Sequence, residues 1–322
     1  MKLARLFFTA LAVTLVSTGA FGQSFPEKPI KIIVGFPPGG PLDTHLRLLT
    51  DQLQKALGQS VIVDYKPGAG GSLAADFVIK SPADGYTLLM ANTGTMVINP
   101  HVYTKNSYDT LRDFTPIART AQQPLALVVN NDVPVKNFAE FREYTKKNPG
   151  KINFGSAGNG GISHLVPVML SDAMGIEMVH VPYKGTAPAF TDLLAGQVQF
   201  MSESIPQITQ YLKAGKIRAL AMTGRERNPA IADVPTMKEV GVDGFEVVGF
   251  YGILAPAKLP ASVTAKLSDA FKTVLGQDEI KSRMIAQGAD PAFLDSAAFN
   301  AFLKTENARW AAAVKKANVK LD

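Results

Sequence analysis

Short apolar runs alternate with amphipathic segments in the first part of the chain. The β-branched run 30–34 predicts a strand that ends at a cluster of prolines and glycines. Leucines at helical spacing then predict a helix over 43–58, with Asp43 as its N-cap and Gly58 at its end. Two further strands and one helix are expected at 61–63, 86–90 and 73–80. Strands separated by helices of this length are typical of βαβ units and a mostly parallel sheet.

The same alternation begins again near residue 125. Asn137, with Glu140 three residues later, resembles a capping box at a helix start, and another helix is predicted over 163–174. The strands expected in this second unit are 125–129, 152–154, 179–182, 198–201 and 217–221. Each unit therefore has a first strand that leads into a glycine-rich loop and then a helix.

The C-terminal segment is too short to form a unit of its own. It contains a strand-like run at 247–254 and three helical segments at 261–275, 278–287 and 296–317. In the last of these, Phe299, Phe302, Trp310 and Val314 lie at spacings that predict a core-facing stripe.

We expect this segment to pack back onto the first unit. The predicted division is a discontinuous first lobe, 24–124 plus 250–322, and a second lobe, 125–249. Two chain crossings between lobes would form a hinge, and hinged closure around a ligand is a known mode of motion.

The N-terminus has the pattern of a secretory signal peptide over residues 1–23. Lys2 and Arg5 precede an apolar run at 6–16, and small residues follow at Ala20 and Gly22. We expect cleavage near residues 20–24 and a periplasmic mature protein; a buried N-terminal helix is the alternative. The run is shorter than the roughly 20 apolar residues that span a bilayer, and no other stretch is a candidate.

Composition excludes several functions. Loss of Lys2 and Arg5 takes the formal charge from +6 to +4, and no Lys/Arg cluster with interleaved aromatics suggests nucleic-acid binding. The chain has no cysteine, and its four histidines (His45, His101, His164 and His180) match no zinc spacing. We expect no metal and no cofactor. The mature length of about 300 residues favours two domains.

Two glycine-rich loops carry the candidate chemistry. The first, 35–43, and the second, 155–164, each follow a predicted strand and open a helix, where ligands bind in open α/β sheets. Glycines let backbone N–H groups approach an anion, and the helix start adds a positive dipole end. The first loop has neither the G-x-G-x-x-G nor the G-K-[ST] pattern, and by itself could be an ordinary turn. Two such loops facing each other favour an anion site, suited to a carboxylate.

A catalytic set is not expected in the second loop. Ser156 does not lie in a G-x-S-x-G elbow. His164 is close in sequence but is expected to face its helix start or the core. Because spacing cannot show hydrogen-bond geometry, an exported serine hydrolase stays open as an alternative.

Ordered motifs over the whole mature chain resemble the tripartite tricarboxylate transporter substrate-binding receptors, also called the Bug receptor family. They include Pro29-Ile30, Gly39-Gly40, Pro67-Gly68-Ala69-Gly70-Gly71, Pro82-Ala83-Asp84-Gly85-Tyr86, Asn148-Pro149-Gly150-Lys151, Ser156-Ala157-Gly158-Asn159-Gly160, His180-Val181-Pro182-Tyr183-Lys184-Gly185, Asp233-Val234-Pro235-Thr236 and Tyr251-Gly252-Ile253-Leu254-Ala255-Pro256.

The resemblance implies an α/β, two-lobed periplasmic-binding-protein (Venus-flytrap) fold, each lobe a mixed, mostly parallel sheet flanked by helices. It implies a ligand such as a di- or tricarboxylate, an amino acid or an aromatic acid, with its carboxylate held between the two loops. By correspondence of position, the ligand-binding residues are Phe36, Pro38, Gly39, Gly40, Leu42 and Asp43 in the first lobe, Ser156, Gly158, Asn159, Gly160 and Gly161 in the second, and Thr93 and Glu203 at other strand ends.

Three of these positions depart from the family pattern. Leu42 and Gly161 stand where hydroxyl side chains are frequent in the family, which implies a more apolar ligand, such as an aromatic acid. Glu203 stands where Asp is common, and we hypothesise that it selects ligands with an amino or ring N–H group; a surface or hinge-side carboxylate is the alternative.

We therefore expect a monomeric, non-enzymatic receptor that passes a small carboxylate to a membrane permease. A periplasmic sensor with a membrane signalling partner is the second reading, since a binding cleft does not dictate its downstream partner.

Overall fold

The structure is a computed structural model that describes residues 25–322. The predicted signal peptide lies outside the described residues. Within 25–322, no helix combines the length and the apolar character needed to cross a membrane. The short helical elements are η1 (Ala69–Gly71), η2 (Gly94–Ile98), α4 (Asn99–Val102), α5 (Thr110–Asp113) and η3 (Pro229–Ile231).

The first unit is built as the pattern predicts. Strand β1 (Ile30–Val34) pairs in parallel with β2 (Val61–Tyr65) and β3 (Thr87–Asn92), and helices α2 (Pro41–Leu57) and α3 (Ser72–Ile79) connect them. The prediction of Asp43 as the N-cap of α2 is wrong, because the helix begins at Pro41 and its cap is Gly40, three residues before Asp43. Pro41 explains the earlier start, since proline lacks the N–H that is unpaired at this position and already has a helical φ.

The second unit repeats this arrangement. Strand β5 (Ile152–Ser156) pairs in parallel with β6 (Met178–Pro182) and β7 (Phe200–Ser204). The other elements are β8 (Ile217–Met222), α6 (Phe138–Lys147), α7 (Ile162–Met174), α8 (Thr186–Leu194) and α9 (Ile205–Lys213). Asn137 caps α6 as predicted, with its side chain accepting the N–H of Glu140.

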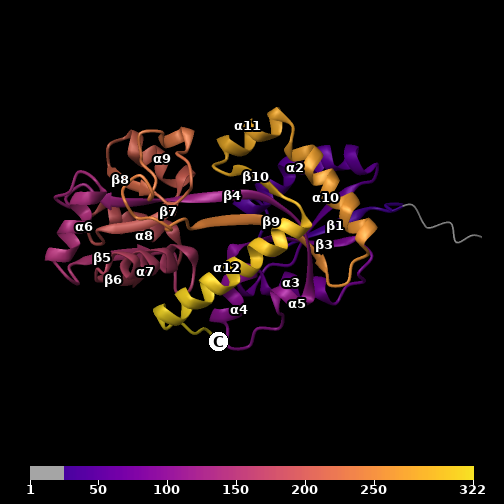
Figure 1. Cartoon of the computed structure of the whole chain (residues 1–322), viewed down its shortest axis with the longest axis horizontal. Coiled ribbons are helices and arrows are strands. Elements are labelled where there is room, and N and C mark those ends of the chain that lie inside the picture. The colour runs from indigo at the N-terminus through magenta and orange to yellow at the C-terminus, as the bar shows by residue number, and fades with distance from the viewer. Residues whose placement is uncertain (1–24) are drawn as a thin grey trace, which may run out of the picture.

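Two long strands join the units. Strand β4 (Phe114–Asn130) and strand β9 (Val248–Pro256) run antiparallel to each other through the middle of the molecule (Figure 1). The strand order is β2-β1-β3-β9-β4-β7-β5-β6, and β8 and β10 (Asp290–Leu294) also pair with β4. The sequence predicted only the 125–129 part of β4, because prolines and glutamines interrupt the apolar alternation of 114–124. It also missed β10, a short strand that pairs with β4.

The register along β4 brings the ends of β3 and β7 close together. Asn92 at the end of β3 pairs with Tyr251, which pairs with Ala121 of β4. Ser204 at the end of β7 pairs with Leu125 of β4, and β7 runs in the opposite direction to β3. Four residues of strand separate these positions, which is about 13 Å. The carboxyl ends of the two parallel sheets therefore point toward each other.

Two of the C-terminal helices pack onto the first unit. Helices α10 (Ala261–Leu275) and α11 (Asp278–Ala286) share a buried apolar cluster with α2 and β1. Helix α12 (Ser296–Ala317) crosses from β4 toward α7 (Figure 1). Phe299, Trp310 and Val314 of its predicted stripe are buried. The lobe boundaries near 124 and 250 fall inside β4 and β9 and stay a prediction.

Candidate functional site

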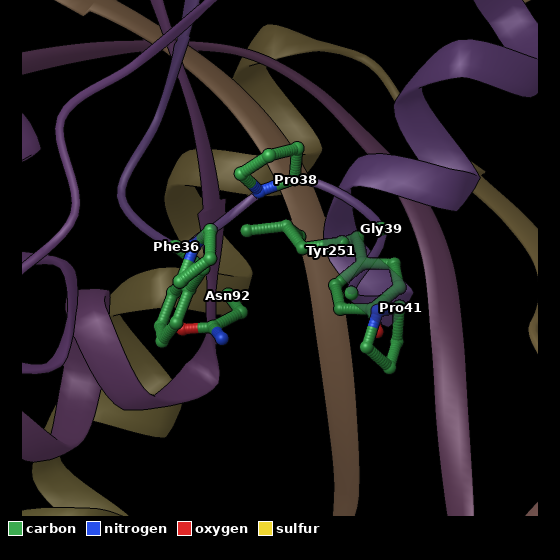
Figure 2. A pocket seen from close by; sticks show the side chains of 9 residues that line it. Phe36, Pro38, Gly39, Pro41, Asn92 and Tyr251 are labelled. Carbon is green, nitrogen blue, oxygen red and sulfur yellow. The ribbon is translucent and has the colours of Figure 1, made fainter.

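The first glycine-rich loop borders a cavity of 580 Å³ at the carboxyl ends of β1 and β3. Figure 2 shows Phe36 and Asn92 on one side of it and Pro41 beside Tyr251 on the other. The cavity is lined mainly by aromatic, proline and glycine residues, namely Phe36, Pro37, Pro38, Gly39, Gly40, Pro41, Leu42, Asn92 and Tyr251. Five of the six predicted first-lobe residues thus lie together, and Asp43 stands directly behind them.

The start of α2 presents unpaired N–H groups. Gly39 has a φ of 84°, which favours glycine, and Gly40 caps the helix with φ −74° and ψ 169° without a side-chain cap. Among residues 25–322, the N–H groups of Gly40, Leu42 and Asp43 have no hydrogen-bond partner. Three free donors at the positive end of a 17-residue helix suit an anion.

Asp43 holds the first loop in shape. Its carboxylate accepts the Gly39 N–H at 2.7 Å, the Tyr65 hydroxyl at 2.6 Å and the Arg47 Nε–H at 3.0 Å. Burial raises the pKa of Asp43, but these hydrogen bonds and the Arg47 charge outweigh it, so the pKa lies below its ordinary value. Because the Gly39 N–H is already used, the Asp43 side chain organises the loop, and the backbone N–H groups of Gly40, Leu42 and Asp43 are the free donors.

The second glycine-rich loop repeats this backbone geometry. Gly160 has a φ of 74°, and Gly161 caps α7 with φ −79° and ψ 168°. The Gly160 N–H donates to Nδ1 of His164 at 3.1 Å, so His164 faces its helix start as predicted. A Gly-Gly pair followed by an acceptor three residues after the cap therefore opens both α2 and α7.

The second loop also keeps free donors. Within the described chain, the N–H groups of Asn159, Gly161, Ile162 and Ser163 have no hydrogen-bond partner. Those of Gly158 and Gly160 are taken by the side chains of Ser156 and His164. These residues do not line the cavity beside the first loop. A Cβ at Gly160 would lie 2.9 Å from Cγ1 of Val102, because the loop packs against the first unit.

Ser156 contacts a histidine, but not the one that is close in sequence. Its hydroxyl lies 2.6 Å from Nε2 of His180, whose ring stacks on His164 with centroids 3.7 Å apart. Burial, with the neighbouring His164, lowers the pKa of His180 to about 4. The Ser156 side chain is fully buried, and no carboxylate of residues 25–322 bonds to His180. A Ser-His-Asp triad needs a nucleophile that substrate can reach and an acid that orients the base, and this pair has neither within the described residues.

The two remaining predicted residues are buried at strand ends. The Thr93 hydroxyl accepts the N–H of Phe250 at 2.8 Å. Glu203 is 7 % exposed and accepts hydrogen bonds from the Ser204 N–H at 3.0 Å and the Thr186 hydroxyl at 3.4 Å. Burial raises the pKa of Glu203 to about 7, against the effect of these two donors. Neither residue lines the cavity beside the first loop.

Sequence reasoning missed Asn92 and Tyr251 in the cavity wall. Asn92 Oδ1 accepts the N–H and hydroxyl of Thr95, and its Nδ2 has no partner within the described chain. Both residues face each other in the β3–β9 register. The rule that ligands bind at strand ends would have found Asn92 once β3 was extended by two residues.

A known receptor family matches most of the chain. The family model described as the tripartite tricarboxylate transporter family receptor matches residues 45–319. The chain belongs to this receptor family. Its members are periplasmic solute-binding proteins, and the predicted two-lobed α/β fold is confirmed.

Relatives and solved structures agree with this assignment. The chain is 35% identical to a UPF0065 protein from the tcbD-tcbE intergenic region of Pseudomonas sp. strain P51, over 94% of this chain and 90% of the relative. It is 32% identical to R. palustris Rpa4515, solved with adipate, with a TM-score of 0.76 over 92% of this chain and 99% of that one. MatC of Rhodopseudomonas palustris, solved with malate, is 32% identical, with a TM-score of 0.71 over 90% and 100%.

Proposed function

We propose that this receptor captures a small carboxylate-bearing solute between its two glycine-rich loops and delivers it to a membrane permease. The observation that carries the proposal is the repeated helix start, in which Gly39-Gly40 and Gly160-Gly161 adopt nearly the same backbone angles. Each start leaves free N–H donors at the positive end of a helix. An acid is the solute class that such paired backbone donors bind best.

The solutes of two related structures support a carboxylate. Adipate and malate are the molecules in the two Rhodopseudomonas palustris structures, and both are acids. The aromatic and proline-rich wall of the first cavity favours an apolar body on the acid bound here. Because the donors are mostly backbone groups, they bind the carboxylate whatever is attached to it. Selectivity for the rest of the solute then comes from the cavity walls.

We infer that the receptor acts in the periplasm and supplies a permease. The predicted signal peptide would place the chain in the periplasm, where a receptor meets its solute before a permease does. Uptake of the solute should then fall in a strain that lacks this receptor. If uptake stayed normal while a transcriptional response to the solute was lost, the partner would be a sensor.

A thermal-shift screen tests the binding step. The mature protein is heated with carboxylic acids, amino acids and the amide of each acid. At about 100-fold excess over its Kd, a true ligand adds about 2.7 kcal/mol of stability. Each kcal/mol raises Tm by about 2–4 °C for domains of about 150–250 residues.

We expect a shift for at least one acid that disappears for its amide. Equal shifts for acid and amide would contradict a carboxylate site. A matched variant, Gly40→Val, should lose the shift, because a side chain at Gly40 meets only ordinary contact with Pro37 but stands beside the free donors.

A further inference from the structure

A second, smaller cavity adjoins the first on the other side of Pro41 and Tyr251. It has a volume of 250 Å³, and Gly39, Pro41 and Tyr251 line both cavities. The remaining lining residues are Thr44, His45, Gln123, Gln287 and Ala289. None of the lining side chains carries a charge when His45 is neutral. A molecule held at the first loop therefore has an uncharged compartment next to it.

His45 lines this compartment and has a ring nitrogen without a hydrogen-bond partner. The side chain is 1 % exposed, and its Nε2 lies 3.0 Å from the Thr120 hydroxyl. Burial lowers the pKa of His45 to about 4, so the ring is neutral at neutral pH. Nδ1 is buried and has no hydrogen-bond partner. Buried polar atoms without a partner are rare in folded proteins, and a bound molecule or water is one way in which such an atom is satisfied.

The proton of the neutral ring can be assigned from its neighbour. The Thr120 hydroxyl has no other hydrogen-bond partner in residues 25–322. If Thr120 donates to Nε2, only Nδ1–H is left unpaired; if Nε2–H donates instead, both Nδ1 and the Thr120 hydrogen are left unpaired. The first arrangement satisfies more groups and makes Nδ1–H a donor.

Tyr251 supplies a second donor on the same wall. Its hydroxyl accepts Nε2–H of Gln123 at 2.7 Å, which leaves its own hydrogen free. Burial raises the pKa of Tyr251 to about 12, so the hydroxyl keeps that hydrogen. The rings of His45 and Tyr251 lie with centroids 5.1 Å apart. Two neutral donors on one wall, with no cation, suit an oxygen acceptor that carries no full charge, since an unpaired buried carboxylate is costly.

We propose that this compartment holds the distal end of the bound acid, and that His45 and Tyr251 select an uncharged oxygen acceptor there, such as a carbonyl. The solute would be a monocarboxylate with an apolar body and a neutral oxygen at its far end. This inference rests on the proposed function, because the carboxylate at the glycine-rich loops fixes which end enters the compartment.

Two matched sets of acids test the preference by calorimetry. The aliphatic set is 6-oxoheptanoate, 6-methylheptanoate and adipate, and the ring set is 4-acetylbenzoate, 4-isopropylbenzoate and terephthalate. Within each set the distal group is a carbonyl, a branched alkyl group of similar shape, or a carboxylate. A site built to hydrogen-bond an oxygen rejects the analogue that lacks it. We expect the ketone acid to bind at least about tenfold more tightly than both partners in the set that fits.

The variant His45→Phe keeps a ring in the wall and removes both nitrogens. It should bring the preference for the ketone acid to within about twofold, while His101→Phe, on α4 and bonded to Asn307, should leave it unchanged. If His45→Phe does not fold, Tyr251→Phe removes only the hydroxyl and should reduce the same preference. In the ¹⁵N spectrum of histidine-labelled wild-type protein, 4-acetylbenzoate or 6-oxoheptanoate should move the Nδ1 signal of His45.

The outcomes separate this inference from the proposed function. Acids that bind with the dicarboxylate tightest, or without preference, would overturn the role of His45 and Tyr251 and leave the carboxylate site standing. An unchanged preference in a folded His45→Phe variant would overturn it as well. Failure of every acid in both sets to bind would count against the carboxylate site itself.

Discussion

Gly160 donates its N–H to Nδ1 of His164 at 3.1 Å. The first loop has the same pairing at the same spacing, but there the acceptor is the Asp43 carboxylate and the donor is Gly39. A carboxylate accepts over a wide pH range, whereas imidazole accepts at Nδ1 only while that nitrogen is unprotonated. The two loops are thus equivalent in shape and different in their response to acid.

We expect stability to fall as the pH drops from about 6.5 to about 4. Burial lowers the pKa of His164, and it lowers those of His45 and His180 to about 4. The unfolded chain binds protons at these residues near pH 6.5, before the native state does, so unfolding becomes easier across that window.

Urea unfolding at several pH values measures this effect. His180→Phe should make the decline shallower by at most about 1 kcal/mol per pH unit, because its ring is partly solvated. The same slope in variant and wild type would show that His180 does not take part.

Asp43→Asn should destabilise the first loop. The carboxylate accepts three hydrogen bonds, and bonds to a charged group contribute about 1.5–3 kcal/mol each to stability. We expect the free energy of unfolding at pH 7 to fall by about 1.5–3 kcal/mol, the contribution of one such hydrogen bond. Since the native pKa of Asp43 is lowered, its contribution is present above the ordinary pKa of 3.8 and is lost as the pH falls through the native value.

The surface variant Asp76→Asn is the matched control. Asp76 pairs with Lys80 at the helical i,i+4 spacing, and such exposed pairs contribute about 0.3–0.5 kcal/mol. Equal losses in the two variants would argue against a special role for Asp43.

Gly39→Val should weaken binding of the ligand acid at least about tenfold. The φ of 84° is unfavourable for a β-branched residue, so the loop must shift even though no atom lies within 4 Å of the new Cβ. Gly150→Val carries similar strain, at φ 68° and also in open space, away from both loops. Calorimetry should show the loss of affinity in the first variant only, while both lose comparable stability.

Glu203→Gln should change the ranking between amino acids and acids without an amino group, if Glu203 selects an N–H donor. A carboxyl with a pKa of about 7 would hold such a donor more strongly above that pH. Competition binding at pH 8 with matched pairs of acids measures the ranking. The same ranking in variant and wild type would show that Glu203 does not determine selectivity.

The raised pKa of Glu203 also predicts how the stability of Glu203→Gln, relative to wild type, changes with pH. Because burial raises the native pKa of Glu203, its favourable effect is complete below the ordinary pKa of 4.5 and is lost as the pH rises through about 7. Relative to wild type, Glu203→Gln should therefore be more stable at pH 8.5 than at pH 6.

Sequence reasoning predicted most of the elements because both units repeat a strand, a glycine-rich loop and a helix. It placed α7 within one residue and the three C-terminal helices closely. It could not predict the full length of β4, since residues 114–124 owe their strand conformation to pairing with β9 rather than to their own pattern. Strand β10 was missed for the same reason.

The candidate site also combines residues that are close in sequence with residues that only the fold brings together. Phe36, Pro38 and the two glycines of the first loop are close in sequence, and they line the first cavity together. Tyr251 and His45 depend on contacts between distant segments, which no local spacing reveals. The contact of Ser156 with His180, rather than with the nearer His164, comes from the register of β5 and β6.

A double-mutant cycle between the two loops tests whether they hold one carboxylate together. Gly40 and Gly161 have ordinary φ angles and room for a Cβ, so Gly40→Val and Gly161→Val lack the strain of the positive-φ glycines. Calorimetry gives the Kd of the acid that stabilises the protein most, for wild type, both single variants and the double variant. If one carboxylate is held by both loops, the double variant should lose less affinity than the sum of the single losses, with a coupling of at least about 1 kcal/mol. Strictly additive losses, or no loss in either single variant, would contradict a shared carboxylate site.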